Sequence, residues 1–568
     1  MTRAHAQLAQ PSDTEELRRR AQAEAQEREQ QRQAPNVNLP TGAANADLNV
    51  DLTSHTLPSE SPCFGVTRLT LVVPKELPEA VQQMGKMDTQ QPPFLFARDY
   101  LSGYAGACIG KQGLETIVQR LGNLILSKGF STTRVGILNQ DLSGGELVIV
   151  LVPGVIRAIR FADPSMAGKW KNAFPTGPGQ LLNLRDLEQG LEQMKRVSSQ
   201  DVTMDIVPGD SPGQSDVVIN VKRTSSWRLT GTLDDSGANT TGKMQAGVNL
   251  ALDNLFWIND VLNVGLNHDA DRNPHLYGTR GNSATYAIPA GYWSVALSGS
   301  SYDYHELIAG VNHNYVSSGI TSNAAFKLSH LFQRDQSQKN SWQFTIGKRW
   351  NHAFIDDTEI AVQERDTTFA ELAWINTTYI GRAQFDMTLS NRWGVNWLNG
   401  QTYSKNIDQQ QDPTTNNLHY TLQTIDATLS APLTIADQTL TYLSTFRGQT
   451  SRSPLYLPDQ FSIGNRYSVR GFDGQLTLIA EQGFYWRNEL DLPIAHSNQV
   501  IYSGIDVGKV IGANTVNLIG DKLAGVVLGA KGAAYGFTYD VFAGWKLYKP
   551  DGFKTTAPAA GFSLSYQY

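Results

Sequence analysis

The sequence lacks any long hydrophobic run. Its best continuous apolar stretch, Leu147 to Val152, has only the length of a strand, whereas a membrane-spanning helix needs about 20 apolar residues. Hydrophobic residues make up 40% of the 568 residues, and the mean hydropathy is -0.32. These values exclude a helical membrane protein and a wholly disordered chain. They leave open a soluble protein of two or three domains and a transmembrane β-barrel, whose polar lumen hides it from hydropathy.

Basic residues and cysteines are also scarce. Forty-seven Lys and Arg stand against 53 Asp and Glu, a net charge of -6, so we expect no nucleic-acid partner. The only cysteines are Cys63 and Cys108, 45 positions apart. They fit either a buried thiol pair in a reducing compartment or a disulfide in an oxidising one. Such a bridge would stabilise the fold by roughly 4 kcal/mol on the loop-entropy argument.

Catalytic signatures are missing as well. The sequence contains no His-Glu-x-x-His pair and no glycine-rich phosphate loop with its lysine. The ten histidines are scattered, and we expect them in loops or a lumen rather than on a metal ion. The sequence therefore predicts a protein that is not an enzyme and that has no metal and no cofactor.

The N-terminal segment, residues 1–33, combines a helical run with an unusual polarity. Its first residues lack the apolar region of a signal peptide, although Ala4-His5-Ala6 has the small-x-small form of a cleavage site, so we expect a trimmed or engineered start. Ser12 and Glu15 form a capping box, and the run that follows holds only one large hydrophobe, Leu17. About 22 helical residues span roughly 33 Å, close to the height of a membrane barrel.

A helix that is polar all round needs water or a polar cavity on every side. The segment is therefore either a solvated tail or a helix held inside a polar lumen. Residues 34–61, rich in Asn, Pro, Thr, Ser and Ala, read as a linker. These 28 residues reach roughly 90 Å when extended.

Two successive segments, residues 62–154 and 155–224, each read as a small α+β module. In both, alternating apolar residues typical of strands accompany one stretch with helical apolar spacing. The helices are expected at Gly113–Lys128 and Leu184–Val197, and the strands at Gly65–Val73, Thr132–Asn139, Glu146–Val152, Val155–Phe161, Val202–Val207 and Asp216–Val221.

The remainder, residues 225–568, contains no convincing helix. Alternating segments such as Trp293-Val295-Leu297 and the terminal Phe562-Leu564-Tyr566-Tyr568 recur about every 20 residues, which is typical of strands between lipid and a polar lumen. Ten of the 11 tryptophans lie here, as interfacial aromatic girdles require. The pattern favours an antiparallel transmembrane barrel of about 16 strands over a large soluble sandwich or propeller.

One loop of this region, residues 451–480, is long enough to expect a function. It contains Val469-Arg470-Gly471-Phe472, in which Arg470 beside a glycine can present its guanidinium fork on a tight turn. Asp506 is the natural partner, since Gly504 and Gly508 on either side leave room for a loop to approach the strand.

Taken together, these motifs resemble the two-partner secretion transporters (TpsB) of the bacterial outer membrane, which carry polypeptide-transport-associated (POTRA) domains. The resemblance covers essentially the whole chain. The first module is similar to a family POTRA1, the long loop to the superfamily's loop-6 motif, and the strand around Asp506 to the wall motif that receives the loop-6 arginine. The matching stretches are Pro62–Phe64, Cys108–Gly110, Lys128–Val135, Gln140–Leu142, Val469–Phe472, Arg487–Leu490 and Gly504–Gly508.

The resemblance implies roles for particular residues. Arg470 would pair with Asp506, Cys63 would be bridged to Cys108, and the N-terminal helix would plug the pore. The plug residues implied in this way are Ser12, Glu15, Leu17, Arg18, Arg19 and Arg20.

It also implies a function. Two POTRA modules in the periplasm would capture one large secreted exoprotein, which would pass unfolded through the barrel pore to the cell surface. The partners would be that exoprotein and the lipids of the outer membrane, with the transporter a monomer. The client stays open among adhesins, haemolysins, haem-scavenging proteins and contact-dependent growth-inhibition toxins. The alternatives are a barrel-assembly insertase, a passive porin and a barrel enzyme.

Overall fold

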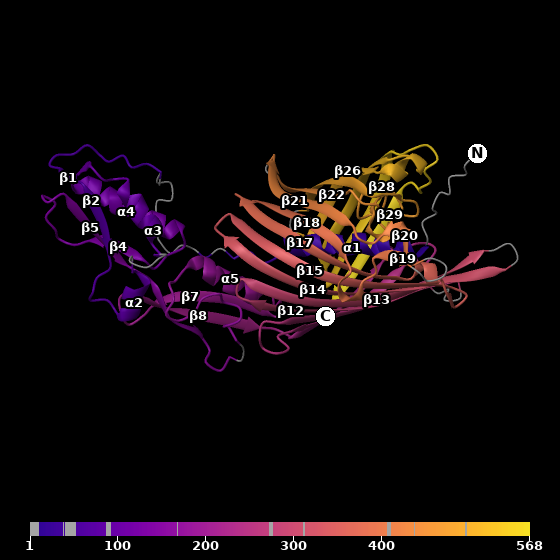
Figure 1. Ribbon diagram of the computed structural model, residues 1–568, viewed down its shortest axis with the longest axis horizontal. Coiled ribbons are helices and arrows are strands. Elements are labelled where there is room, and N and C mark those ends of the chain that lie inside the picture. Colours follow the sequence, from indigo (N-terminus) through magenta and orange to yellow (C-terminus); the bar gives the residue numbers. More distant parts are fainter. Residues whose placement is uncertain are drawn as a thin grey trace.

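The computed structural model describes residues 11–37, 39, 53–86, 92–166, 169–271, 276–309, 313–405, 411–436, 438–494 and 497–568. The first ten residues of the predicted plug segment and half of the predicted linker lie outside them, as does the side chain of Ser12. Figure 1 shows two small modules at one end of an elongated molecule and a barrel at the other, with helix α1 (Pro11–Arg32) inside the barrel.

The first module is a three-stranded sheet covered by helices. Its strand order is β2-β5-β4, with β2 and β5 parallel, and β1 pairs separately with β3. Two short helices, α2 and α3, were not predicted because six and eight residues are too few to show helical spacing. The bounds are β1 Phe64–Val66, β2 Arg68–Val72, α2 Glu79–Met84, α3 Leu95–Ser102, β3 Ala107–Ile109, α4 Lys111–Ser127, β4 Arg134–Ile137 and β5 Glu146–Val152.

A disulfide joins Cys63 to Cys108 and ties the start of β1 to β3. Behind it, Ile117, Leu121 and Ile125 of α4 are buried against the sheet. The bridge therefore closes the edge of the module while apolar packing fills its core.

The second module repeats the plan with one helix. Strand β6 (Val155–Phe161) is followed by α5 (Leu184–Lys195), β7 (Gln200–Pro208) and β8 (Gln214–Arg223), in the sheet order β6-β8-β7. The side chain of Asn183 caps α5 by accepting the Arg185 amide at 2.9 Å. Helix α5 lies between its own sheet and the rim of the barrel, so the module is docked directly on the barrel (Figure 1).

Sixteen antiparallel strands form the barrel, as predicted, and β29 closes it by pairing with β9. The two-residue β16 (Thr358–Glu359) only extends the end of β15. The sixteen strands are β9 Trp227–Asp234, β10 Gln245–Asp253, β11 Val261–Asp269, β12 Tyr277–Ala290, β13 Trp293–Ala309, β14 Asn314–Arg334, β15 Gln338–Ile355, β17 Arg365–Ile380, β18 Ala383–Val395, β21 Thr421–Ile435, β22 Gln438–Ser451, β25 Gln482–Pro493, β26 Gln499–Ile511, β27 Lys522–Ala534, β28 Phe537–Tyr548 and β29 Ala559–Gln567.

Alternation along the strands separates two environments. In β13, Trp293 and Leu297 are exposed on the outside, whereas Tyr302 and Tyr304 are buried on the inside. At the end next to the modules, the rings of Trp227 and Tyr568 lie 5.7 Å apart across the closure. Within the described part of the chain, no helix has the length and hydropathy to cross a membrane.

The connections next to the modules are short, as at Gly291 and Gly381, and those at the opposite end are longer. Between β18 and β21 stands the hairpin of β19 (Tyr403–Lys405) and β20 (Gln411–Asn417). Between β22 and β25 the chain forms β23 (Phe461–Ile463) and β24 (Leu478–Ala480), which pair with each other. This last connection is the long loop predicted at 451–480.

Removing the disulfide tests its share of stability. The double replacement of Cys63→Ala and Cys108→Ala should lower the unfolding free energy of the first module by about 4 kcal/mol, because the unfolded chain regains the loop entropy. Proteolysis of the full chain in increasing urea would report this as an earlier loss of residues 62–154. An unchanged cleavage midpoint would contradict it.

Candidate functional site

The lumen of the barrel holds two segments that come from elsewhere in the chain. One is the loop between β22 and β25, which folds back inside, and the other is helix α1. Their contacts with the wall differ in kind, and the difference decides which of them can move.

The loop is seated by an apolar cluster and a buried ion pair. Val469 and Phe472 pack with Ile463 and Leu478 of the loop's own hairpin, against wall and rim residues that include Val510. This packing removes the loop from the water of the lumen and anchors it to the wall. The packing of Val469 and Phe472 therefore fixes the position of Arg470, which lies between them.

Arg470 faces two carboxylates at once. Its Nε donates to Asp506 Oδ2 at 2.7 Å and its Nη2 donates to Asp506 Oδ1 at 2.9 Å, a bidentate pair. Its backbone amide donates to the same Oδ2 at 2.9 Å, and Nη1 donates to Glu489. The side chains of Arg470 and Asp506 are 5% and 1% exposed. Because a buried ion pair that loses one partner leaves an uncompensated charge, separating them costs several kcal/mol.

Glycines in the wall make this close approach possible. A Cβ added at Gly504 would lie 2.7 Å from Arg470 Nη2, and one at Gly508 would lie 2.8 Å from Val469 Cγ2. A Cβ at Gly525 would meet the Arg470 carbonyl oxygen at 1.9 Å. Gly471 itself has φ +101°, a conformation that L side chains rarely adopt.

Sequence reasoning named the arginine, the aspartate and two of the glycines, and the structure brings these residues together. It did not assign Glu489, although that residue lies in the quoted stretch Arg487–Leu490, and it missed Gly525 and Lys531. Lys531 Nζ lies 2.8 Å from Glu489 and balances its charge. The available signal for Gly525 is its place directly opposite Asp506 in the strand register.

Helix α1 is held by charged contacts on several sides. Glu16 pairs with Arg349 of β15 at 2.9 Å, and Glu24 pairs with Arg447 of β22 at 2.6 Å. On another side, Arg28 donates to Asp426 of β21 at 2.9 Å. The polar composition of the helix therefore matches a polar wall around it, not open solvent.

The predicted plug residues lie at the far end of this helix. Arg18 donates to the Ser236 carbonyl at 3.0 Å, and Arg19 lies over the ring of Tyr302 at 4.2 Å. Arg20 donates to the Pro458 carbonyl at 3.1 Å, so the helix also touches the seated loop. Glu15 accepts from Arg18 and Arg19. The side chain of Ser12, its predicted partner in the capping box, lies outside the described residues.

Leu17, the single large hydrophobe of α1, is buried. The helix otherwise contacts the wall through charged and polar groups that are mostly buried: the side chains of Glu16 and Arg349 are 10% and 13% exposed, and those of Arg447 and Glu24 are 7% and 23% exposed. It can therefore leave the lumen at a low cost in exposed apolar surface. Among the described residues, no group of three or more His, Cys, Asp or Glu side chains could hold a metal ion.

Models of known protein families match most of the chain. The sequence profile of the family described as haemolysin secretion/activation protein ShlB/FhaC/HecB matches residues 213–532. A ShlB-type POTRA domain matches residues 92–154, and a further POTRA domain matches residues 155–208.

Similar proteins carry consistent names. The chain is 43% identical over 526 residues to outer membrane transporter CdiB-2 of Burkholderia pseudomallei, covering 90% of this chain and 88% of the relative. It is 28% identical to hemolysin transporter protein ShlB of Serratia marcescens, covering 72% of each. The solved structure of CdiB from Acinetobacter baumannii superposes with a TM-score of 0.83 at 26% identity, covering 99% of this chain and all of that one.

Substitution of a wall glycine tests whether the loop packs against the barrel wall. Gly525→Ala should displace the loop, because the new Cβ overlaps the carbonyl of Arg470. We expect trypsin to cleave the segment 452–481 at least tenfold faster than in the unmodified protein. Gly231→Ala is the matched control, since a Cβ there meets nothing within 4 Å. A change in gel migration on heating would show that both barrels are folded. Equal cleavage rates in the two folded variants would contradict the packing of the loop against Gly525.

Proposed function

The chain belongs to the ShlB/FhaC/HecB family of haemolysin secretion/activation proteins, and we propose that it exports one large toxin of the contact-dependent growth-inhibition type. It is an outer membrane transporter of the two-partner secretion type, with its POTRA domains in the periplasm. The family is one of transporters rather than enzymes, and its members work with a large exoprotein partner. The choice of a growth-inhibition toxin rests on the 43% identity to a transporter named CdiB-2.

The observation that carries the transport mechanism is a polar helix inside a polar lumen. Helix α1 fills the pore through ion pairs with β15, β21 and β22, and its departure would leave a passage lined by the same polar groups. An extended polypeptide can pass such a wall without adhering, because little apolar surface faces it. We assign to residues 11–32 the role of a plug that leaves before export.

Capture would take place on the modules. Strand β4 of the first module and β7 of the second are edge strands in their sheets, and an extended client segment can add to such an edge by main-chain hydrogen bonds. The sequence has no nucleotide-binding loop, so folding of the client outside the cell would supply direction. A closed barrel needs no second copy, and we propose a monomer.

The Arg470–Asp506 pair would keep the loop seated while the client passes. Loss of the pair would let the loop move into the path that α1 leaves. We therefore assign Val469, Arg470, Gly471 and Phe472 to a fixed loop and Gly504, Asp506 and Gly508 to its receptor in the wall.

Secretion of the neighbouring exoprotein tests the function. A strain that lacks this chain should lose the large exoprotein encoded beside it from the medium, while other outer-membrane proteins stay at normal levels. Arg470→Ala and Asp506→Ala should reproduce this loss with a folded barrel. A joint fall of many barrel proteins would indicate an assembly factor instead, and unchanged secretion would return the porin and enzyme alternatives.

Deleting residues 11–32 tests the plug. We expect the channel current across a planar lipid bilayer to rise severalfold, because the helix no longer occupies the lumen. Single-channel recordings of the purified deletion variant beside the full chain would measure it. Equal conductance in the two proteins would contradict the plug.

A further inference from the structure

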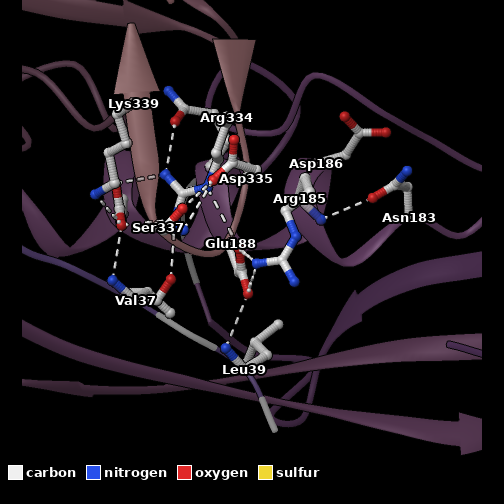
Figure 2. Close-up of polar contacts among 12 residues, drawn as sticks. Val37, Leu39, Asn183, Arg185, Asp186, Glu188, Arg334, Asp335, Ser337 and Lys339 are labelled. Atoms are coloured by element: carbon white, nitrogen blue, oxygen red, sulfur yellow. Dashed lines mark hydrogen bonds and ion pairs between the residues drawn. The ribbon is translucent and has the colours of Figure 1, made fainter. Parts of the chain in front are cut away.

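A short stretch of the linker is held at the junction of the second module and the barrel. The backbone amide of Val37 donates to Glu192 Oε1 at 2.7 Å, and that of Leu39 donates to Glu188 Oε1 at 3.0 Å. The carbonyl of Val37 accepts from Arg334 Nη2 at 2.9 Å. Figure 2 shows these groups converging from the linker, from α5 and from the turn between β14 and β15.

The receiving groups are built into a buried cluster. Glu188 and Glu192 lie one turn apart on α5, and Arg334 at the end of β14 donates to both oxygens of Glu192 at 2.8 Å. Lys339 Nζ adds a contact to Glu192 at 2.7 Å, and Arg185 donates to Glu188 at 2.6 Å. The side chains of Arg334 and Glu188 are 1% and 0% exposed.

The charges of this cluster hold one another in place. Burial alone would raise the pKa of Glu192, but the hydrogen bonds and charges of Arg334 and Lys339 lower it below its usual value. The carboxylate is therefore ionised and remains an acceptor for the linker amide. Gln189 and Gln193 fix α5 to the barrel by donating to the Gly291 carbonyl, each at 3.1 Å.

The cluster binds the linker through backbone atoms and not through its side chains. The amides of residues 37 and 39 and the carbonyl of residue 37 face the cluster, which is the two-residue period of an extended strand. The side chains of Val37 and Leu39 pack against the core of the second module. The occupant is thus an extended segment with small or medium apolar side chains at alternate positions.

The position of this contact shortens the tether of α1. Helix α1 ends at Arg32 and the held residue is Val37, so five residues, about 18 Å when extended, join the two. If the contact opened, the helix would be restrained by about 20 residues with a reach of roughly 70 Å, because the linker is next held at the first module, where Arg120 donates to the Ser54 carbonyl at 3.1 Å and Glu60 accepts the Gln112 amide at 2.8 Å.

We propose that Glu188, Glu192 and Arg334 form a latch that holds the main chain of Val37 and Leu39 and so keeps the plug in the pore. The proposal deepens the function above and rests on it, since a latch matters only if α1 leaves during export. An extended segment of the exported protein offers the same amides and carbonyl, and by competing for the latch it would release the plug when a client is present.

Proline substitutions test the latch because they remove the two backbone N–H donors, and alanine substitutions at the same positions control for the loss of the side chains. The double variant Val37→Pro with Leu39→Pro lacks both amides, and we expect its open time in planar bilayers to rise at least tenfold toward that of the variant without residues 11–32. The double variant Val37→Ala with Leu39→Ala keeps both amides and should stay closer to the unmodified protein. Heat-modifiable migration in gels confirms that each barrel is folded.

A competing peptide gives a second, independent test of the latch. The octapeptide of residues 34–41, Ala-Pro-Asn-Val-Asn-Leu-Pro-Thr, added in excess to the full chain on the side of the modules, should increase opening by competing with the linker. The same peptide N-methylated at its Val and Leu should not.

The outcomes separate the latch from the plug. If the proline variant and the peptide both leave the open time unchanged while deletion of residues 11–32 opens the pore, the latch is wrong and the plug stands. If that deletion has no effect either, plug and latch both fail. Secretion of the exoprotein, measured apart, reports on the export function.

Discussion

A closed barrel in a membrane must turn its apolar side chains outward, and this constraint leaves a largely polar lumen for whatever the barrel contains. The loop and the helix inside this barrel meet the requirement in opposite ways. The loop brings its own apolar hairpin and covers it against the wall, so that Arg470 and Asp506 are shut away from water. The helix brings almost no apolar surface and is held by ion pairs whose side chains are mostly buried, such as those of Glu24 and Arg447, which are 23% and 7% exposed.

This contrast explains how one lumen can contain a fixed part and a movable part. Removing Arg470 from Asp506 would strand a buried carboxylate, which is costly, and the wall fits the loop closely because its glycines lack the Cβ atoms that would meet Arg470 and Val469. When α1 leaves, water can fill the lumen behind it and hydrate Glu24, Arg28 and their partners in the wall, so no charge is left buried without a partner. A transporter of this kind needs a wall that keeps its shape while its contents change.

Much of this architecture follows from the sequence, and the exceptions have physical reasons. Alternation and turn composition predict the barrel and its sixteen strands. Helical spacing predicts α4 and α5, whereas a capping box followed by helix-forming residues predicts α1. The helices α2 and α3 could not be predicted, because each is shorter than the window in which helical periodicity can be recognised. The pairing of Arg470 with Asp506 could be expected from flanking glycines, but Gly525 and Lys531 act through strand register, which one sequence does not display. The contacts of Val37 and Leu39 use backbone atoms, which leave no trace in residue type.

The linker that follows the plug has a kinetic consequence. The tether between α1 and the first module has about 20 residues, since Ser54 is already bound by Arg120 of that module. A chain of this length keeps its ends roughly 25 Å apart on average, so an expelled helix stays near the pore at a local concentration of about a millimolar. With only Leu17 as a large hydrophobe, it offers little for chaperones or other chains to retain. Once the client has passed, rebinding is a fast event within one molecule, and the membrane is sealed again without any expenditure of energy.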